Sequence, residues 1–272
     1  MASPTVLAAS PPLSPDQAKI LQSVTACALR YTQKLPDFMC TRITHRQISS
    51  LINAAGEPTG VTGLGALAVA LPDITRSTST LRDVIEERLT FIDHKENYTV
   101  IAVNGRKVTG VDHIQFQGAI STGEFGTDLH NIFDPRSSTV FSWDRPGAFP
   151  GSRIYIYLFR VPAQHGAVVV DLDSGSQVVA SCAGRIFVEA VTLAVLRIEY
   201  HFDLPQGFPI RDAAVIVDYR PIAIAGRRYI LPFRADVRMR DHSRQYVSTI
   251  DFRDYHKFVV ESTVVYGAQS PQ

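Results

Sequence analysis

Residues 196–203 read LRIEYHFD, in which apolar and polar side chains alternate without a break. The stretch from Tyr229 to Arg240 largely follows the same pattern. Because successive side chains of a β-strand point to opposite faces, each stretch has one apolar and one polar face. Such alternation is typical of an antiparallel sheet that is covered on one side only. The sequence therefore predicts a large one-sided sheet whose apolar face needs a cover or a ligand.

Length and composition indicate a globular protein without a transmembrane segment. The chain has 272 residues, of which 45% are hydrophobic and 19% charged, enough to form a substantial core. Its 27 Lys and Arg residues balance 26 Asp and Glu residues, so the formal net charge is +1. This balance gives no electrostatic reason to expect nucleic acid or an anionic membrane as a partner. No apolar run approaches the roughly 20 residues that a membrane-spanning helix needs.

Short connections rich in turn-forming residues separate a series of predicted strands. Asn104-Gly105 predicts a tight hairpin, and turns such as Leu204–Gly207 and Asp241–Ser243 follow later. Connections this short favour sequential antiparallel pairing, which is a meander. We expect strands at residues 38–49, 81–93, 98–103, 139–144, 153–161, 167–172, 177–181, 184–189, 193–202, 213–224, 228–239, 246–254 and 258–265.

Two helices are expected beside these strands. The first covers Pro15 to Lys34, because Ser14 and Gln17 form a capping box, Pro15 occupies the first helical position and Pro36 follows the end. Its apolar side chains recur at helical spacing. The second covers about 123–133, capped by Ser121 or Thr122 and ended by Asp134-Pro135.

A wide apolar sheet with so few helices would expose a large apolar patch if it stayed flat. A closed barrel, a sandwich and a half-barrel packed on helices would each solve this, and the long first helix favours the half-barrel. We therefore predict a mainly β (α+β) protein: a large curved antiparallel sheet covered by a long N-terminal helix and a shorter second helix. We expect one domain over 1–272, with flexible ends at 1–13 and 267–272 and a Gly-rich insertion or flap at 53–80.

Several passages resemble a family of bacterial envelope proteins. Val217–Arg220 with Ile224–Pro232 forms a hairpin of "DY…GRRYxLP" form, and Val191–Tyr200 precedes Leu204-Pro205. Both resemble the periplasmic lipoprotein carriers of the LolA/LolB type. Two further passages, 35–41 and 121–126, are similar to uncharacterised exported bacterial proteins. The resemblance implies a helix-covered half-barrel and a periplasmic or secreted location, with the signal peptide absent from this sequence.

A half-barrel of this kind commonly leaves an apolar cavity, and such a cavity suits a lipid or acyl chain. A lipoprotein or another envelope protein would then be the macromolecular partner. The alternative is an envelope interaction module whose core is filled by its own side chains, and an enzyme is the weakest hypothesis. The predicted ligand wall consists of Leu196, Ile198, Tyr200, Phe202, Val215, Val217, Tyr219, Leu231, Phe233 and Val237.

The remaining motifs predict no catalytic residue, cofactor or metal site. Residues 63–68 match a dinucleotide fingerprint by chance, since no βαβ unit surrounds them. His201 and Asp203 share a polar strand face as a ligand pair would, and Asp241–Ser243 lie too close in sequence to form a catalytic relay. We expect Cys27, Cys40 and Cys182 to be buried free thiols, although one disulfide stays possible. Cross-strand ion pairs are expected among Arg234, Asp236, Arg238, Arg240, Asp251 and Arg253.

Overall fold

The computed structural model describes residues 12–51, 77–110, 125, 127–149, 151–170 and 175–258. These residues form helices α1 (Pro15–Lys34) and α2 (Thr127–Phe133) and the 3-10 turns η2 (Pro135–Ser137) and η3 (Ala163–His165). The strands are β1 (Phe38–Leu51), β2 (Ser77–Ile92), β3 (Lys95–Val103), β4 (Arg106–Lys107), β5 (Val140–Phe149), β6 (Ser152–Val161), β7 (Ala167–Val170), β8 (Gln177–Glu189), β9 (Val195–Asp203), β10 (Asp212–Ile224), β11 (Arg227–Arg240) and β12 (Arg244–Lys257).

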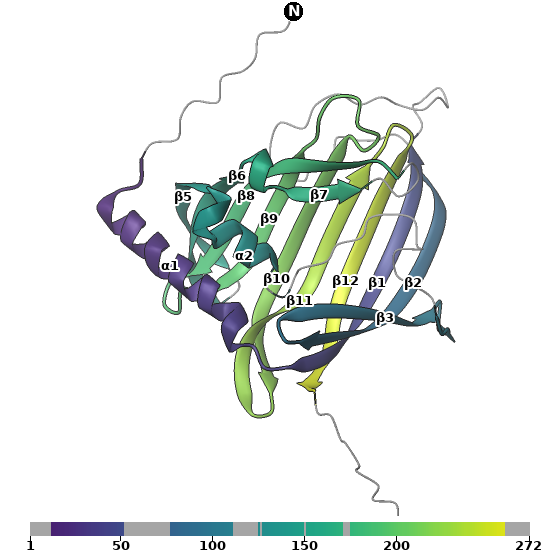
Figure 1. The fold of residues 1–272 in the computed structure, drawn as a ribbon, viewed down its shortest axis with the longest axis horizontal. Helices are drawn as coiled ribbons and strands as arrows, with labels where there is room; N and C mark the ends of the chain where they lie inside the picture. Colours follow the sequence, from purple (N-terminus) through teal and green to yellow (C-terminus); the bar gives the residue numbers. More distant parts are fainter. Residues whose placement is uncertain are drawn as a thin grey trace, which may run out of the picture.

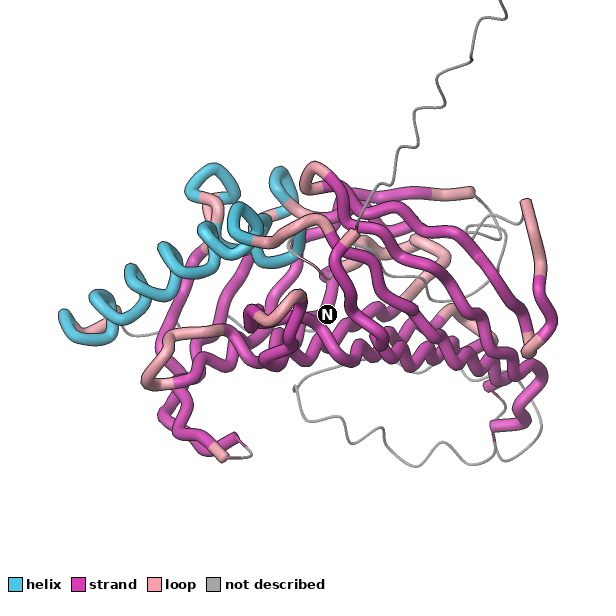
Figure 2. Tube along the Cα trace, turned by 90° about the horizontal axis from the view of Figure 1, so that it is seen from below, coloured by secondary structure: helices cyan, strands magenta, loops and turns pink. Residues whose placement is uncertain are grey.

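All the strands join into one antiparallel sheet with the order β4-β3-β2-β1-β12-β11-β10-β9-β8-β6-β5, and β7 pairs with β8 beside this path. The sheet consists of two meanders, which meet where β1 pairs with β12. It curves without closing, and α1 and α2 lie on its concave side (Figures 1 and 2). The predicted mainly β half-barrel with a long N-terminal helix and a shorter second one is thus confirmed.

The capping box at the start of α1 is present. Ser14 N donates to Gln17 Oε1 at 2.9 Å, and Gln17 N donates to Ser14 Oγ at 3.3 Å, so two backbone donors of the first turn are satisfied. The helix covers Pro15–Lys34 as predicted. On its apolar side Val24 and Ala28 are buried in the main core.

The hairpin signal at Asn104-Gly105 is also confirmed. Both residues have positive φ, 50° and 74°, as a type I′ turn requires, and Val103 pairs with Arg106 across it. Asp134-Pro135 ends α2 as expected, with Asp134 Oδ1 accepting from Arg136 N at 2.8 Å to cap η2.

Other predicted boundaries differ. The strands expected at 177–181 and 184–189 are one strand, β8. Gly184 does not break it, because a residue without a side chain allows the backbone of β9 to approach closely. Helix α2 begins at Thr127 rather than 123, and residues 121–124 lie outside the described residues. Residues 77–80 of the expected flap open β2, whereas 53–76, 1–11 and 267–272 are not described. Of the strand expected at 258–265, only Phe258 is described, and it follows the end of β12.

The main core fills the space between the concave face and the two helices. Aromatic rings connect its parts: Phe38 stacks on Phe91 with 5.1 Å between centroids, and Phe125 meets Phe252 edge to face at 5.1 Å. The largest fully buried side chains are Tyr157, Phe38, Phe125, Phe252, Leu89, Ile154, Ile186, Ile198, Ile224, Leu231 and Ile250.

Candidate functional site

The structure brings most of the predicted ligand wall together in the main core, on the concave face. Phe202 is partly buried and packs against this core. The buried members are Ile198, Tyr200, Val215, Val217, Tyr219, Leu231 and Val237. These residues are buried together in the main core, and their role in ligand binding stays a prediction.

Two predicted wall residues lie outside the main core, and both sit at irregularities in strand pairing. Between β8 and β9 the register shifts so that Val195 pairs with Val188, and Val195 occupies the core in place of Leu196. Phe233 is skipped where β10 pairs with β11, and its ring lies 4.6 Å from the Arg220 guanidinium instead. Their predicted place on the core face is therefore wrong, because a strict period of two cannot register an extra residue in one strand.

Hydrogen bonds tie both helices to the strands beneath them. Tyr157 Oη on β6 donates to the Gln17 carbonyl of α1 at 2.8 Å, and Tyr200 Oη on β9 donates to Asp128 Oδ2 of α2 at 3.2 Å. Burial raises the pKa of Tyr157 to about 12, so its hydroxyl keeps the donated proton at neutral pH. Each helix is thus held by apolar packing together with a side-chain hydrogen bond.

A small cavity lies between α2 and the sheet. Its volume is about 30 Å³, close to the share of one water molecule and far below the several hundred Å³ of a usual ligand pocket. It is lined by Asp128, Asn131, Ile132, Val161, His165, Gly166, Ala167, Cys182 and Tyr200. This cavity is therefore too small to hold a lipid or an acyl chain.

Cys182, His165 and Asp128 all line this cavity, which is the residue set of a thiol enzyme. Burial, with the carboxylates of Asp128 and Asp203 nearby, raises the pKa of the Cys182 thiol from 9.0 to about 12. Because the thiolate is the nucleophile, this thiol is not activated at neutral pH. The cavity therefore gives no support to the enzyme hypothesis. Cys40 is also buried and Cys27 half-buried, and all three are free thiols, so the expectation of full burial is wrong for Cys27.

We expect Cys182 in the folded protein to react with iodoacetamide at pH 8 at least about a hundredfold more slowly than in urea, because its thiolate fraction falls about a thousandfold when the pKa rises from 9 to 12. The same shift stabilises the fold fully below pH 9. This stabilisation is lost as the pH rises from 9 to 12, where only the unfolded thiol ionises. Peptide mapping after timed alkylation measures the rate at Cys182, and equal rates in both states would contradict the assignment.

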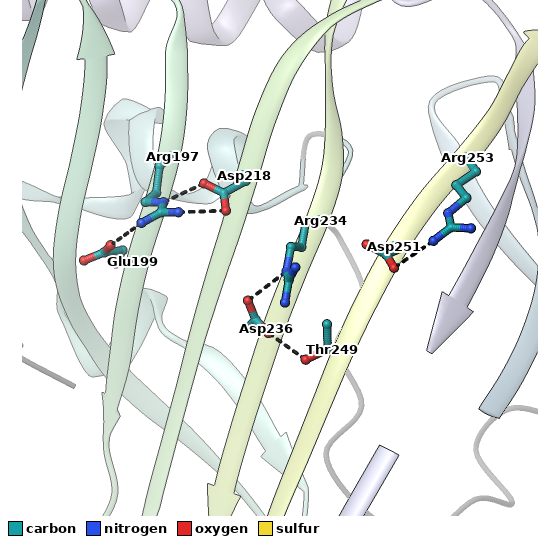
Figure 3. A network of polar contacts seen from close by, with 8 residues as sticks. All are labelled: Arg197, Glu199, Asp218, Arg234, Asp236, Thr249, Asp251 and Arg253. Atoms are coloured by element: carbon teal, nitrogen blue, oxygen red, sulfur yellow. Dashed lines mark hydrogen bonds and ion pairs between the residues drawn. The ribbon is translucent and has the colours of Figure 1, made fainter. Parts of the chain in front are cut away.

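The convex face carries the charged ladder (Figure 3). Arg197 Nε donates to Asp218 Oδ1 at 2.5 Å across β9 and β10, and Arg240 Nε donates to Asp212 Oδ2 at 2.7 Å across β10 and β11. Two other pairs, Arg234 with Asp236 at 3.4 Å and Arg253 with Asp251 at 3.2 Å, run along one strand, so the expected cross-strand pairing is wrong there. In these two pairs the arginine is exposed, and such pairs stabilise a protein little. The ladder as a whole is a structural feature.

The other motifs do not form a site. His201 Nε2 lies 3.7 Å from Asp203 Oδ1, and burial lowers the pKa of His201, which favours the neutral imidazole. The described residues nevertheless hold no group of three or more metal-binding side chains. Asp241 Oδ1 accepts from Ser243 N at 2.6 Å, and His242 accepts from Arg211, so these residues form a turn. The fingerprint at 63–68 lies outside the described residues.

Sequence reasoning missed a polar strip on the concave face of β1 and β2. Arg42 Nη1 donates to Glu87 Oε2 at 2.6 Å, with both residues almost fully buried. Four residues further along β1, Arg46 Nε donates to Asp83 Oδ1 at 2.7 Å. The signal was available, because Arg42 and Arg46 share their parity with Phe38, which belongs to the core.

Comparisons with known proteins give matches in structure only. No family model matches the chain, and no curated protein matches it by sequence. A domain from Vibrio parahaemolyticus named for outer membrane lipoprotein sorting matches with 10% identity and a TM-score of 0.34, covering 87% of this chain and 90% of that one. A DUF1329 family protein from Desulfovibrio piger matches with 11% identity and a TM-score of 0.37, covering 89% and 94%.

At such TM-scores neither match bears on function. No helix within the described residues has the length and hydrophobicity that a membrane span requires.

Proposed function

We propose that this protein binds an apolar molecule, such as the acyl chain of a lipid, on the concave face of its half-barrel in the periplasm or outside the cell, without catalysing a reaction. The supporting observation is a continuous apolar wall that only two helices cover among the described residues. A lipoprotein or another envelope protein would deliver or receive the ligand.

The cavity beside α2 has only about 30 Å³, so we propose that a ligand gains its place by displacing α1, which lies on the same concave side. A chain of about 14 methylenes contributes roughly 11 kcal/mol of apolar burial before ordering costs, at about 0.8 kcal/mol for each. Helix α1 buries only Val24 and Ala28 completely. The partly buried apolar side chains of α1 are Ile20, Leu21, Leu29 and Tyr31. An acyl chain can therefore compensate for the contacts that α1 gives up.

We expect Tyr157→Phe to take up a fluorescent fatty acid about fivefold faster than the wild type. The change keeps the buried ring and removes the hydrogen bond to the Gln17 carbonyl, which is worth about 1 kcal/mol to the covered state. Stopped-flow fluorescence measures the rate. Tyr155→Phe, two residues along the same strand, is the matched control and should leave the rate unchanged. Equal rates in all three proteins would contradict α1 as the moving cover.

The small cavity and the absence of exposure at Ile198, Val217 and Leu231 favour a second candidate. In it the protein is an envelope interaction module whose core its own side chains fill. Native mass spectrometry of gently purified protein separates the two candidates. A co-purifying lipid or the uptake of a fatty acid supports the carrier. If the wild type and Tyr157→Phe both lack a co-purifying lipid and take up no fatty acid, the filled module is supported.

A further inference from the structure

The polar strip lies on the face that the proposed ligand would contact. On β1, Arg42, Thr44 and Arg46 alternate with residues of the convex face. Across the ladder they pair with Glu87, Ile85 and Asp83 of β2. On the other side, Arg42 pairs with Phe252, Thr44 with Ile250 and Arg46 with Ser248 of β12. Apart from Ser248, the strip is thus bordered on the β12 side by apolar side chains.

Two oxygen atoms in this strip are buried with no hydrogen-bond partner among the described residues. They are Thr44 Oγ1, in a residue that is 5% exposed, and Glu87 Oε1, in a residue that is 1% exposed. The other carboxylate oxygen of Glu87 accepts from Arg42. Buried polar atoms are nearly always satisfied in native proteins, and those that are not call for an explanation such as a ligand or a water molecule.

The two oxygen atoms belong to neighbouring side chains. Arg42 pairs directly with Glu87, so Thr44, two residues further along β1, is the diagonal neighbour of Glu87 on the same face. A carboxylate oxygen only accepts hydrogen bonds, and a hydroxyl oxygen accepts as well as donates. One small polar group with two donors can therefore reach both.

The charges of the strip indicate that this group is neutral. Arg42 is paired with Glu87 and Arg46 with Asp83, so two positive charges already balance two negative ones. A phosphate or an ammonium group would bring an uncompensated charge into a buried place, which is unfavourable. A hydroxyl or an amide N–H adds donors without a charge.

From this geometry we infer that Thr44 and Glu87 form a subsite for the neutral hydrogen-bond donors of a lipid head group, such as the two free hydroxyls of a monoacylglycerol. The inference rests on the proposed function and extends it. The apolar wall holds the acyl chain, and the strip between β1 and β2 selects among lipids that carry the same chain.

The test compares two probes that differ only at the head, 1-monooleoylglycerol and methyl oleate, as competitors of a bound fluorescent fatty acid on the full chain. We expect the wild type to bind the monoacylglycerol at least about fivefold more tightly than the ester, as one additional hydrogen bond provides. Thr44→Val, which keeps the side-chain shape, should reduce this ratio to about one. The control Thr41→Val changes the same residue type on the opposite face of β1 and should keep it.

Glu87→Gln tests the second oxygen atom, Glu87 Oε1. This variant should also lower the ratio of the two affinities. Equal affinities for the two probes in the wild type, or a ratio unchanged in both Thr44→Val and Glu87→Gln, would overturn the subsite while the carrier function stands. If the fluorescent fatty acid itself does not bind and neither probe binds, both proposals are overturned. Thermal unfolding of each variant shows that its fold is intact.

Discussion

Replacing Gly184 by alanine should destabilise the protein by more than about 4 kcal/mol, beyond the usual range of a point substitution. A Cβ atom at this position would lie 1.8 Å from the Glu199 carbonyl oxygen and 2.7 Å from Tyr200 Cα. Both atoms belong to the backbone of β9, so no side-chain rotation can relieve the overlap. Strands β8 and β9 would have to separate where the wall residue Tyr200 is anchored.

Urea denaturation of the wild type and the variant measures this loss. Gly147→Ala on β5 is the matched control, because its Cβ would meet only side-chain carbons of Ile156 and Ile154, at 3.3 Å and beyond. We expect the control to cost less than about 1 kcal/mol, since side chains can shift by a few tenths of an ångström. Similar losses in the two variants would show that β8 and β9 do not approach so closely.

Replacing Glu87 by leucine should cost about 3 to 5 kcal/mol of unfolding free energy, because the guanidinium of Arg42 would lose its buried carboxylate partner. The double variant Glu87→Leu/Arg42→Leu should regain most of this loss, since a buried ion pair exchanged for apolar side chains is often nearly neutral. Denaturation by urea measures both variants.

Glu86→Leu serves as the control for Glu87. Glu86 is the neighbouring residue on the opposite, convex face of β2 and is only half-buried. Its replacement should change stability by less than about 1 kcal/mol. If Glu87→Leu were as mild as Glu86→Leu, the carboxylate would not be buried in the fold that is populated in solution.

Local patterns in the sequence were sufficient to predict most of the helices and strands. The alternation around Ile198 and Val237, the capping box at Ser14 and the turn at Asn104 each arise from neighbours in the chain, and the structure confirms the elements that they predict. The half-barrel was predicted because the sequence contains many strand patterns and only two helix patterns, so a flat sheet would have left its apolar face uncovered.

Features that depend on pairing between distant segments could not be predicted. Leu196 and Phe233 lie outside the main core because the strand register shifts beside them, and such a shift is visible only in the pairing with the neighbouring strand. The pairing of β1 with β12 brings together residues that are far apart in the sequence, such as Phe38 and Lys257. The volume left beneath the helices depends on how α1 and α2 rest on the sheet, so the sequence could not choose between a cavity and a filled core.

The neighbourhood of β1 and β12 has a consequence for how the chain folds. Bringing Phe38 to Lys257 closes a loop that contains almost the whole protein, and contacts of such sequence separation are formed slowly. Until β12 emerges from the ribosome, β1 presents an unsatisfied edge that can pair with other chains. The nascent chain should therefore depend on a chaperone at this stage, and this dependence should end abruptly once β12 is available.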